Sequence, residues 1–236
     1  MKRRLLFIVR FTIRLMLGLF LFSLLLVIIY RFVPPPFTFL MIQRCVEQKL
    51  AGKEMKLHKD WVPLEEISKA VPLAVITAED QKFEEHMGFD FEAIEKAQQY
   101  NERKKGKKIK GASTISQQTA KNVFLWPARS YIRKGFEVYF TFLIELLWSK
   151  ERIMEIYLNV IEMGDGVYGI ESASHLYFRK PASKLSMEEA ALIAACLPNP
   201  LRWKPSVPSP YISKKKRWIL RNMKWVVRPD WDKKSL

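Results

Sequence analysis

The sequence predicts a mainly α-helical protein with one membrane-spanning helix near its amino terminus. Leu15–Tyr30 is sixteen residues long and contains no charged residue, as expected of a helix in lipid. Ser130–Lys150 has the length of a long helix. Its part from Val138 to Trp148 is apolar nearly all round, so we expect it to be central and buried. Alternation of apolar and polar residues, which is typical of strands, is nearly absent.

The apolar run extends through its flanks to Val33, which gives roughly 20 residues, enough to span about 30 Å of hydrocarbon as a helix. Three prolines at 34–36 then end the helix. A cleaved secretory signal is the alternative interpretation. It fits less well, because the run is longer than a usual signal core and no small-x-small cleavage site follows it. We therefore predict an uncleaved transmembrane anchor over residues 15–33.

Positive charge is concentrated before the apolar run. Five basic residues precede it, namely Lys2, Arg3, Arg4, Arg10 and Arg14, and only Arg31 follows closely. The cytoplasmic flanks of membrane helices carry an excess of Lys and Arg. We therefore predict a cytoplasmic basic tail over residues 1–14 and an extracytoplasmic domain over residues 37–236.

The composition limits the kind of protein further. The chain has 236 residues, of which 49% are hydrophobic, so the part beyond the anchor can bury the core of one compact domain. The formal net charge is +16. Solubility and contact with anionic lipid explain this excess, and binding of nucleic acid is the sharper alternative. No spacing of Cys and His resembles a zinc site, and we expect Cys196, in an Ala-rich run, to be a small buried side chain.

Shorter elements follow the anchor. Phe37–Ile42 is apolar and should either pack in the core or insert shallowly into the lipid interface. Pro63–Glu79 reads as a helix that is interrupted near Pro72. Residues 101–111 are highly charged and interrupted by glycine, so we expect a mobile loop there.

The second half of the chain continues the helical pattern. A further helix should begin at Ser149, and the glycine-rich residues 164–169 indicate a turn. Ser186 and Glu189 have the spacing of a capping box, which predicts the start of another helix. The tail from Pro205 is rich in proline and then basic with three tryptophans. It is either a peripheral amphipathic helix or a membrane-facing lip.

Two glutamates occupy positions where a carboxylate is costly. Glu79 ends an apolar run, and Glu137 opens the helix that we expect to be buried. Burying a carboxylate costs several kcal/mol unless it is paired or hydrogen-bonded. A helix-end residue paired with a nearby Lys or Arg is the simpler explanation of each. For Glu79 considered alone, we favour that simpler explanation.

A group of cations lies between the two glutamates in the sequence: Lys121, Arg129, Arg133 and Lys134. Such a cluster usually lies on a solvated face. Here aromatic and apolar residues are interleaved with the charges, which favours the rim of a cleft that takes phosphate.

A turn of small residues, Gly111–Thr114, precedes Gln117 and Gln118, and such a turn presents backbone amides to an anion or a sugar. His86 has no defined partner in the sequence, so we interpret it as a residue that orients the local turn.

Taken together, these segments resemble glycosyltransferase family 51, the peptidoglycan transglycosylases, in its monofunctional biosynthetic branch. Five motifs carry the resemblance, in order, over about residues 60 to 205. They match Glu79-Asp80-x-x-Phe83-x-x-His86-x-Gly88, Gly111 to Asn122, Arg133-Lys134-x-x-Glu137, the region from Tyr157 to Phe178, and the region from Leu185 to Pro200. Ala112 and Ser116 stand where the family has Gly and Thr. No transpeptidase domain follows, so we expect the monofunctional branch.

The resemblance implies a lysozyme-like helical fold with a large lobe and a smaller membrane-proximal lobe. It also implies that lipid II is polymerised into β-1,4-linked glycan strands, with inversion and release of undecaprenyl pyrophosphate. It further implies a single-pass protein of the bacterial cytoplasmic membrane. Its expected partners are lipid II, the growing strand, membrane lipids and other proteins of cell-wall synthesis, but no nucleic acid.

By similarity, Glu79 is the general base and Glu137 is the second essential glutamate. Lys121 and Arg129 match positions that contact pyrophosphate, and Arg133 belongs to the third motif. The expected positions in the substrate cleft are Ser113, Thr114, Gln117 and Gln118. No cofactor is obligatory, and a divalent cation, Mg²⁺ or Mn²⁺, is compatible with the leaving group.

Two other functions compete at this stage. A lytic enzyme would use paired carboxylates on the same lysozyme fold to cleave finished glycan. The cationic group between the glutamates argues for a pyrophosphate donor instead. A membrane-tethered nucleic-acid or scaffold protein is supported by the net charge alone.

Overall fold

The computed structural model describes residues 2–105, 110–128, 130–227, 229 and 231. It divides into two units, one ending at Pro34 and the other starting at Pro35. The first unit is helix α1, Lys2–Phe32. Its segment Leu6–Phe32 is long and apolar enough to cross a membrane, and no other helix in the described ranges is. The helix ends before the prolines, as predicted, while its apolar segment begins upstream of the predicted start at Leu15.

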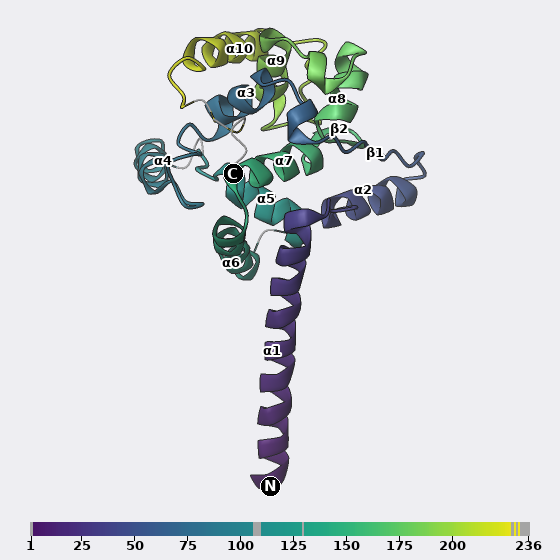
Figure 1. Cartoon of the computed structure of the whole chain (residues 1–236), viewed down its shortest axis with the longest axis vertical. Coiled ribbons are helices and arrows are strands. Elements are labelled where there is room, and N and C mark those ends of the chain that lie inside the picture. Colours follow the sequence, from purple (N-terminus) through teal and green to yellow (C-terminus); the bar gives the residue numbers. More distant parts are fainter. Residues whose placement is uncertain (1, 106–109, 129, 228, 230, 232–236) are drawn as a thin grey trace. The chain divides into compact units, whose positions relative to one another are not determined.

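The second unit is mainly helical, as predicted (Figure 1). Its helices are α2 (Phe39–Leu50), α3 (Ala70–Glu79), α4 (Phe91–Arg103), α5 (Ile115–Phe124), α6 (Tyr131–Leu147), α7 (Lys150–Val160), α8 (Ile170–Phe178), α9 (Met187–Cys196) and α10 (Pro210–Asn222). Two short 3₁₀ turns, η1 (Leu64–Glu66) and η2 (Ala182–Lys184), lie between them. Ser149 caps α7 and Ser186 forms the capping box of α9, so both predicted helix starts are confirmed.

The structure contains a small sheet that the sequence did not predict. Its strands are β1 (His58–Lys59), β2 (Glu162–Gly164) and β3 (Val167–Tyr168), in the order β1-β3-β2. β3 pairs parallel to β1 and antiparallel to β2. Of the predicted turn at 164–169, Gly164, Val167 and Tyr168 therefore lie in strands, and Asp165 and Gly166 form the turn itself. Strands of two or three residues are too short to give an alternating pattern in the sequence.

The predicted interruption at Pro72 is wrong. After η1 the chain starts α3 at Ala70, which places Pro72 in the first turn of the helix. The backbone nitrogens of the first turn have no partner within a helix, so proline costs nothing there. The helix then runs without a break to Glu79.

Helix α6 is buried on one face only, which corrects the expectation of a helix buried all round. Phe140 and Ile144 are buried, whereas Phe136, Phe142 and Leu146 are exposed. The buried face packs mainly on α5, and Phe124 of α5 stacks on Phe140 at 4.6 Å between ring centres. An apolar sequence predicts that a segment is shielded from water. It does not tell whether protein or lipid shields the segment.

The core lies where α3, α9 and α10 pack together and where α5 packs on α6 and α7. Four buried alanines of α9 (Ala190, Ala191, Ala194 and Ala195) allow α3 and α10 to approach closely. Cys196 is buried, as predicted, and both cysteines are free. The tail forms an amphipathic helix, α10, which buries Ile212 and Ile219. Of the predicted loop at 101–111, residues 101–103 belong to α4, and 106–109 lie outside the described residues.

Candidate active site

Glu79 is the last residue of α3, and α5 provides its main partner. Gln118 Nε2 donates a hydrogen bond to Glu79 Oε2 at 3.1 Å. The other end of the same amide, Gln118 Oε1, accepts a hydrogen bond from the hydroxyl of Tyr157 at 3.4 Å. Tyr157 is fully buried in α7. The three side chains therefore form a short chain that fixes one oxygen of the Glu79 carboxylate.

The surroundings of Glu79 favour its protonated form more than water does. Burial raises the pKa of Glu79, and the charge of Asp80 adds to the rise. The hydrogen bond from Gln118 and the charges of Lys215 and Lys121 act in the opposite direction. A carboxylate whose pKa is raised toward neutrality takes up a proton more readily, as a general base must.

Glu137 forms a second charged centre. Its side chain is 3% exposed, one oxygen accepts from Arg133 Nη1 at 2.8 Å, and the other accepts from Lys134 Nζ at 2.5 Å. Arg133 also has a buried Nε that finds no hydrogen-bond partner within the described residues. The pairing with nearby cations, expected as the simpler explanation, is therefore confirmed. It leaves an unused donor on Arg133.

Lys121 connects the two centres. Burial lowers the pKa of Lys121, and the charges of Arg133 and Lys134 add to the fall, while Glu137 and Glu79 both oppose it. Lys121 therefore lies within electrostatic reach of both glutamates. Glu79 and Glu137, which the sequence separates by 58 positions, therefore act on one common lysine and belong to one charged region.

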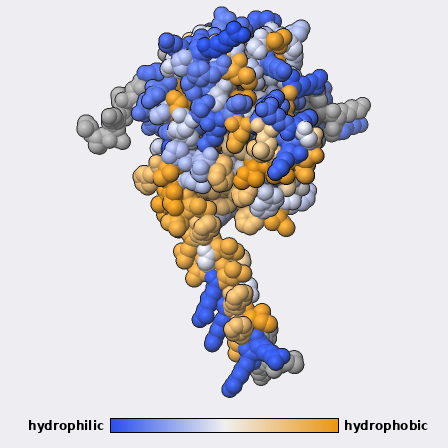
Figure 2. Space-filling model, turned by 90° about the vertical axis from the view of Figure 1, so that its right-hand side faces the viewer, coloured by the Kyte–Doolittle hydropathy of each residue, from blue (hydrophilic) through white to orange (hydrophobic). Residues whose placement is uncertain are grey.

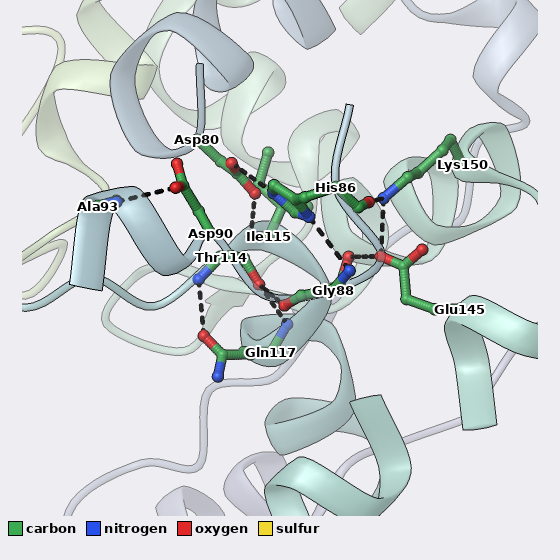
Figure 3. Close-up of polar contacts among 11 residues, drawn as sticks. Asp80, His86, Gly88, Asp90, Ala93, Thr114, Ile115, Gln117, Glu145 and Lys150 are labelled. Carbon is green, nitrogen blue, oxygen red and sulfur yellow. Dashed lines mark hydrogen bonds and ion pairs between the residues drawn. The ribbon is translucent and has the colours of Figure 1, made fainter. Parts of the chain in front are cut away.

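Asp80 links the two helices that carry Glu79 and Gln118. One of its oxygens lies 2.8 Å from His86 Nε2, and the other accepts from the backbone nitrogen of Ile115 at 2.9 Å (Figure 3). This carboxylate ties the end of α3 to the start of α5, the two helices that carry Glu79 and Gln118. His86 Nδ1 in turn accepts from the backbone nitrogen of Gly88 at 3.1 Å, which confirms its interpretation as a turn-orienting residue.

The turn before α5 is fixed by its own side chains. Thr114 and Gln117 form a reciprocal capping box, and the Thr114 hydroxyl also donates to the carbonyl of Gly88 at 2.7 Å (Figure 3). Both side chains are buried. Their hydrogen bonds hold the amino terminus of α5 in place, which orients Gln118 one position further along.

A third glutamate of this region, Glu145, has a structural environment. Its Oε1 accepts from Ser116 at 2.5 Å and from Lys150 Nζ at 2.8 Å, and Lys150 also donates to the carbonyl of His86 at 2.6 Å. These bonds join α5, α6, α7 and the His86 turn (Figure 3). Ser116, which replaces the family's Thr, keeps the hydroxyl that this contact needs.

The structure thus brings together five of the residues singled out in the sequence: Glu79, Gln118, Lys121, Arg133 and Glu137. Thr114 and Gln117 stand beside them but use their side chains within the protein. Ser113 is exposed at the entrance to α5. Arg129 lies outside the described residues.

Sequence reasoning missed Lys215 and gave no role to the hydroxyl of Tyr157. Lys215 lies in a run of three lysines, so nothing local distinguishes it. The helical spacing carries the only signal, because Lys215 stands three residues after the buried Ile212 and four before the buried Ile219. It therefore shares the inward face of α10.

A separate cavity of about 470 Å³ lies at the other end of α3. Leu64, Lys69, Leu73, Met187 and Trp231 are among its lining residues. It contains none of the residues of the charged site, so it is not the site in which these groups would act.

Comparison with known proteins identifies the family. The model of a protein family described as transglycosylase matches residues 47–224, which include the whole charged site. The chain belongs to the transglycosylase family.

Several curated relatives in this family share more than half of their aligned residues with the chain. A biosynthetic peptidoglycan transglycosylase of Bdellovibrio bacteriovorus is 55% identical over 214 residues, which cover 91% of this chain and 85% of the relative. One of Bacteroides thetaiotaomicron is 52% identical over 230 residues, covering 97% and 92%. One of Yersinia pseudotuberculosis is 54% identical over 198 residues, covering 84% and 82%. The resemblance inferred from the motifs is therefore confirmed, and the match extends beyond residues 60–205.

Proposed function

We propose that this transglycosylase polymerises lipid II into β-1,4-linked glycan strands. The observation that carries the proposal is the single site formed by Glu79, Lys121 and Glu137, with a partly buried carboxylate at one end and three cations at the other. Full-length relatives named biosynthetic peptidoglycan transglycosylases support the substrate class.

Glu79 acts first in the proposed reaction. The ionised carboxylate takes the proton of the acceptor's sugar 4-hydroxyl while that oxygen attacks the anomeric carbon of the donor. A new C–O bond forms on one face, and the bond to pyrophosphate breaks on the other, so the configuration inverts. Gln118 keeps Glu79 pointed in one direction during this step.

The cations act on the leaving group. Undecaprenyl pyrophosphate gains negative charge as its bond to the sugar breaks, and fixed positive groups stabilise that charge. Lys121 is the donor that we assign to it, and the positive charge of Arg133 beside Lys121 adds to the stabilisation. Glu137 keeps Arg133 and Lys134 in position through its two ion pairs.

The same contacts argue against the lytic alternative. A hydrolytic pair needs a second carboxylate that can act on water or on the sugar. Both oxygens of Glu137 are taken by cations, so Glu137 is not available for that role.

The donor set does not fit a metal ion held by the protein. No group of three or more His, Cys, Asp or Glu side chains capable of holding a metal occurs in the described ranges. Glu137, the carboxylate near the cations, is already neutralised by Arg133 and Lys134. We assign no step to a resident Mg²⁺ or Mn²⁺.

The proposed location is the cytoplasmic membrane, with the catalytic unit outside. The charge asymmetry around α1 supports this orientation. A reporter enzyme that works only outside the cytoplasm, fused after residue 236, should be active. If a reporter that works only in the cytoplasm is active at the same fusion point, the predicted orientation is wrong.

The central test uses the purified full chain in detergent with lipid II. We expect glycan polymer and undecaprenyl pyrophosphate to appear together, and Glu79→Gln to lower the rate by about 10²–10⁴-fold while lipid II still binds. Finished glycan strands serve as the second substrate. Cleavage of those strands without polymerisation of lipid II would establish the lytic alternative instead.

A further inference from the structure

The outward face of α10 carries a row of alternating aromatic and basic side chains. Tyr211, Lys214, Trp218 and Arg221 follow one another at spacings of three and four, which places them on one face of a helix. Trp225 continues the row in the turn after the helix. All five are exposed, Tyr211 by 59% and Trp225 by 77%. We call these five residues the α10 row.

The charge of this surface is one-sided. Residues 203–227 contain no Asp or Glu, and Arg217 and Lys224 add two exposed cations beside the row. Lys216, on the flank, pairs with Glu188 of α9 at 3.0 Å. Within the part of the chain that the structure describes, Lys214 and Arg221 form no ion pair. The row therefore presents cations that are available to an anionic ligand.

Two of the three aromatic rings in the α10 row lie against a neighbouring side chain. Trp203 lies against Tyr211 with 5.4 Å between ring centres, and Lys224 lies over the ring of Trp225 at 4.9 Å. Tyr211, Trp218 and Trp225 all remain exposed, by 59%, 40% and 77%. Flat apolar faces with a polar edge suit the C–H faces of sugar rings.

A lipid surface fits this row less well than a glycan does. Helices that insert into the interface bury an apolar face in it. The apolar face of α10 is already used, since Ile212 and Ile219 are buried where α10 packs on α9 and α3. What α10 exposes is charge at every second position of the row.

The apolar surface of this unit lies elsewhere. α6 exposes Ile132, Phe136, Phe142 and Leu146, and α6 and α10 lie at opposite ends of the unit (Figure 1). On the face shown in Figure 2, hydrophobic residues gather toward the α6 end of the unit, and hydrophilic residues predominate at the opposite end. A unit that meets lipid through its apolar end turns the α10 row toward the solvent side.

We infer that the α10 row is a glycan-binding surface for peptidoglycan strands, separate from the charged site around Glu79. Sugar rings would pack on Tyr211, Trp218 and Trp225, and the carboxylates of the stem peptides would bind Lys214 and Arg221. This inference rests on the proposed function, in which such strands are the product. The enzyme would then bind the strand at a second place, without using the groups that react.

The test measures binding of the full chain, in detergent micelles, to three probes: purified insoluble peptidoglycan, chitin, and vesicles of phosphatidylglycerol. We expect tight, salt-sensitive binding to peptidoglycan and weaker binding to chitin, which has the sugars but not the carboxylates. Lys214→Gln with Arg221→Gln, and separately Trp218→Ala with Trp225→Ala, should each weaken the binding to peptidoglycan on the order of tenfold.

Matched controls remove the same chemistry elsewhere. Lys49→Gln with Lys53→Gln deletes two exposed cations, and Phe91→Ala deletes an exposed ring. These variants should bind peptidoglycan like the unaltered protein. Because all the altered side chains are exposed, we expect every variant to fold normally. Thermal melting of each variant checks this.

Three outcomes would overturn the inference. The α10 variants could bind peptidoglycan normally, the controls could lose as much binding, or the α10 variants could lose vesicle binding and keep peptidoglycan binding. The last outcome would make the row a membrane contact. Glu79→Gln should retain peptidoglycan binding. The binding test therefore stays interpretable even if the proposed reaction is wrong.

Discussion

Gln118 donates to Glu79 across 3.1 Å, and the same amide accepts from the hydroxyl of Tyr157. The consequence is a partly buried carboxylate that is held by a neutral amide, with no ion pair to it among the described residues. Positive charge acts on it from Lys215 and Lys121, neither of which forms an ion pair with it in the described part of the chain. Such a group can change its protonation state during a reaction, whereas both oxygens of Glu137 are occupied by contacts with Arg133 and Lys134.

The first prediction concerns Lys215 and the pH dependence of polymerisation. The positive charge of Lys215 lowers the pKa of Glu79, so Lys215→Met should raise that pKa. A general base works only when ionised, so the acidic limb of the kcat/KM profile should move to higher pH. The profile with lipid II measures the shift.

Lys216→Met is the matched control for this variant, because Lys216 is the next residue and pairs with Glu188 instead. Its profile should match that of the unaltered protein. A Lys215→Met profile that keeps its acidic limb, or shifts it to lower pH, would remove Lys215 from the environment of the base.

The second prediction concerns stability. Folding raises the pKa of Glu79 above its unfolded value, so the folded chain binds this proton more tightly than the unfolded chain. The contribution of Glu79 to stability is therefore lost as pH rises from the unfolded pKa through the folded pKa. Glu79→Gln should melt at a higher temperature at pH 7, by about 2–4 °C for each kcal/mol regained.

The gain from Glu79→Gln should shrink as the pH falls below the unfolded pKa, because the glutamate is then protonated in both states. Calorimetry over a pH series tests this sign. A variant that melts lower than the unaltered protein at pH 7 would show that the ionised carboxylate stabilises the fold.

The third prediction concerns the leaving group. Lys121→Ala should lower kcat/KM for lipid II. The loss of transition-state stabilisation should be about 1.5–3 kcal/mol, the value of a charge-assisted hydrogen bond. Lys96→Ala, which removes an exposed cation paired with Glu92, is the control and should leave kcat/KM unchanged. Equal effects of the two substitutions would mean that only net charge matters.

The fourth prediction separates the two roles open to Glu137. Glu137→Gln keeps the shape of the side chain but removes the charge that orients Arg133 and Lys134. We expect turnover to fall by at least about 10²-fold, with circular dichroism unchanged. If the variant is inactive because it unfolds, Glu137 is a structural partner of its two cations, and its part in the reaction should be dropped.

The sequence singled out most of the side chains that the structure brings together, while their roles in a reaction stay predictions. Glu79 and Glu137 could be found because a carboxylate beside apolar residues needs an explanation. The prediction that Val138 to Trp148 is buried all round failed because Val138, Phe142 and Leu146 are apolar yet exposed, so their apolar character does not serve the protein core. The short strands β1, β2 and β3 gave too few residues for any period to appear.

Contacts between distant segments could not be predicted in the same way. The bond from Asp80 to the backbone of Ile115 spans 35 positions, and nothing in either segment specifies the other. Lys215 reaches Glu79 only because the alanines of α9 let α3 and α10 come close. Helix spacing gave the inward direction of Lys215 but not the group that it meets.

The last prediction concerns Gly88, in the turn that His86 orients. Gly88 has a φ of +82°, and a Cβ placed there would lie 2.7 Å from Thr141 Cγ2. Both the backbone conformation and the contact oppose a side chain, so Gly88→Ala should destabilise the fold by about 1–3 kcal/mol. It should also lower polymerisation, because the Gly88 carbonyl accepts from Thr114, which caps the helix carrying Gln118.

Gly135→Ala is the control for Gly88→Ala. Gly135 lies inside α6, and a Cβ there meets nothing within 4 Å, so alanine should stabilise the helix by about 0.5–1 kcal/mol. Chemical denaturation of the two variants gives both free energies of unfolding. Opposite signs are expected, and a Gly88→Ala variant as stable as the unaltered protein would mean that this turn relaxes freely and does not hold α5 in register with Glu79.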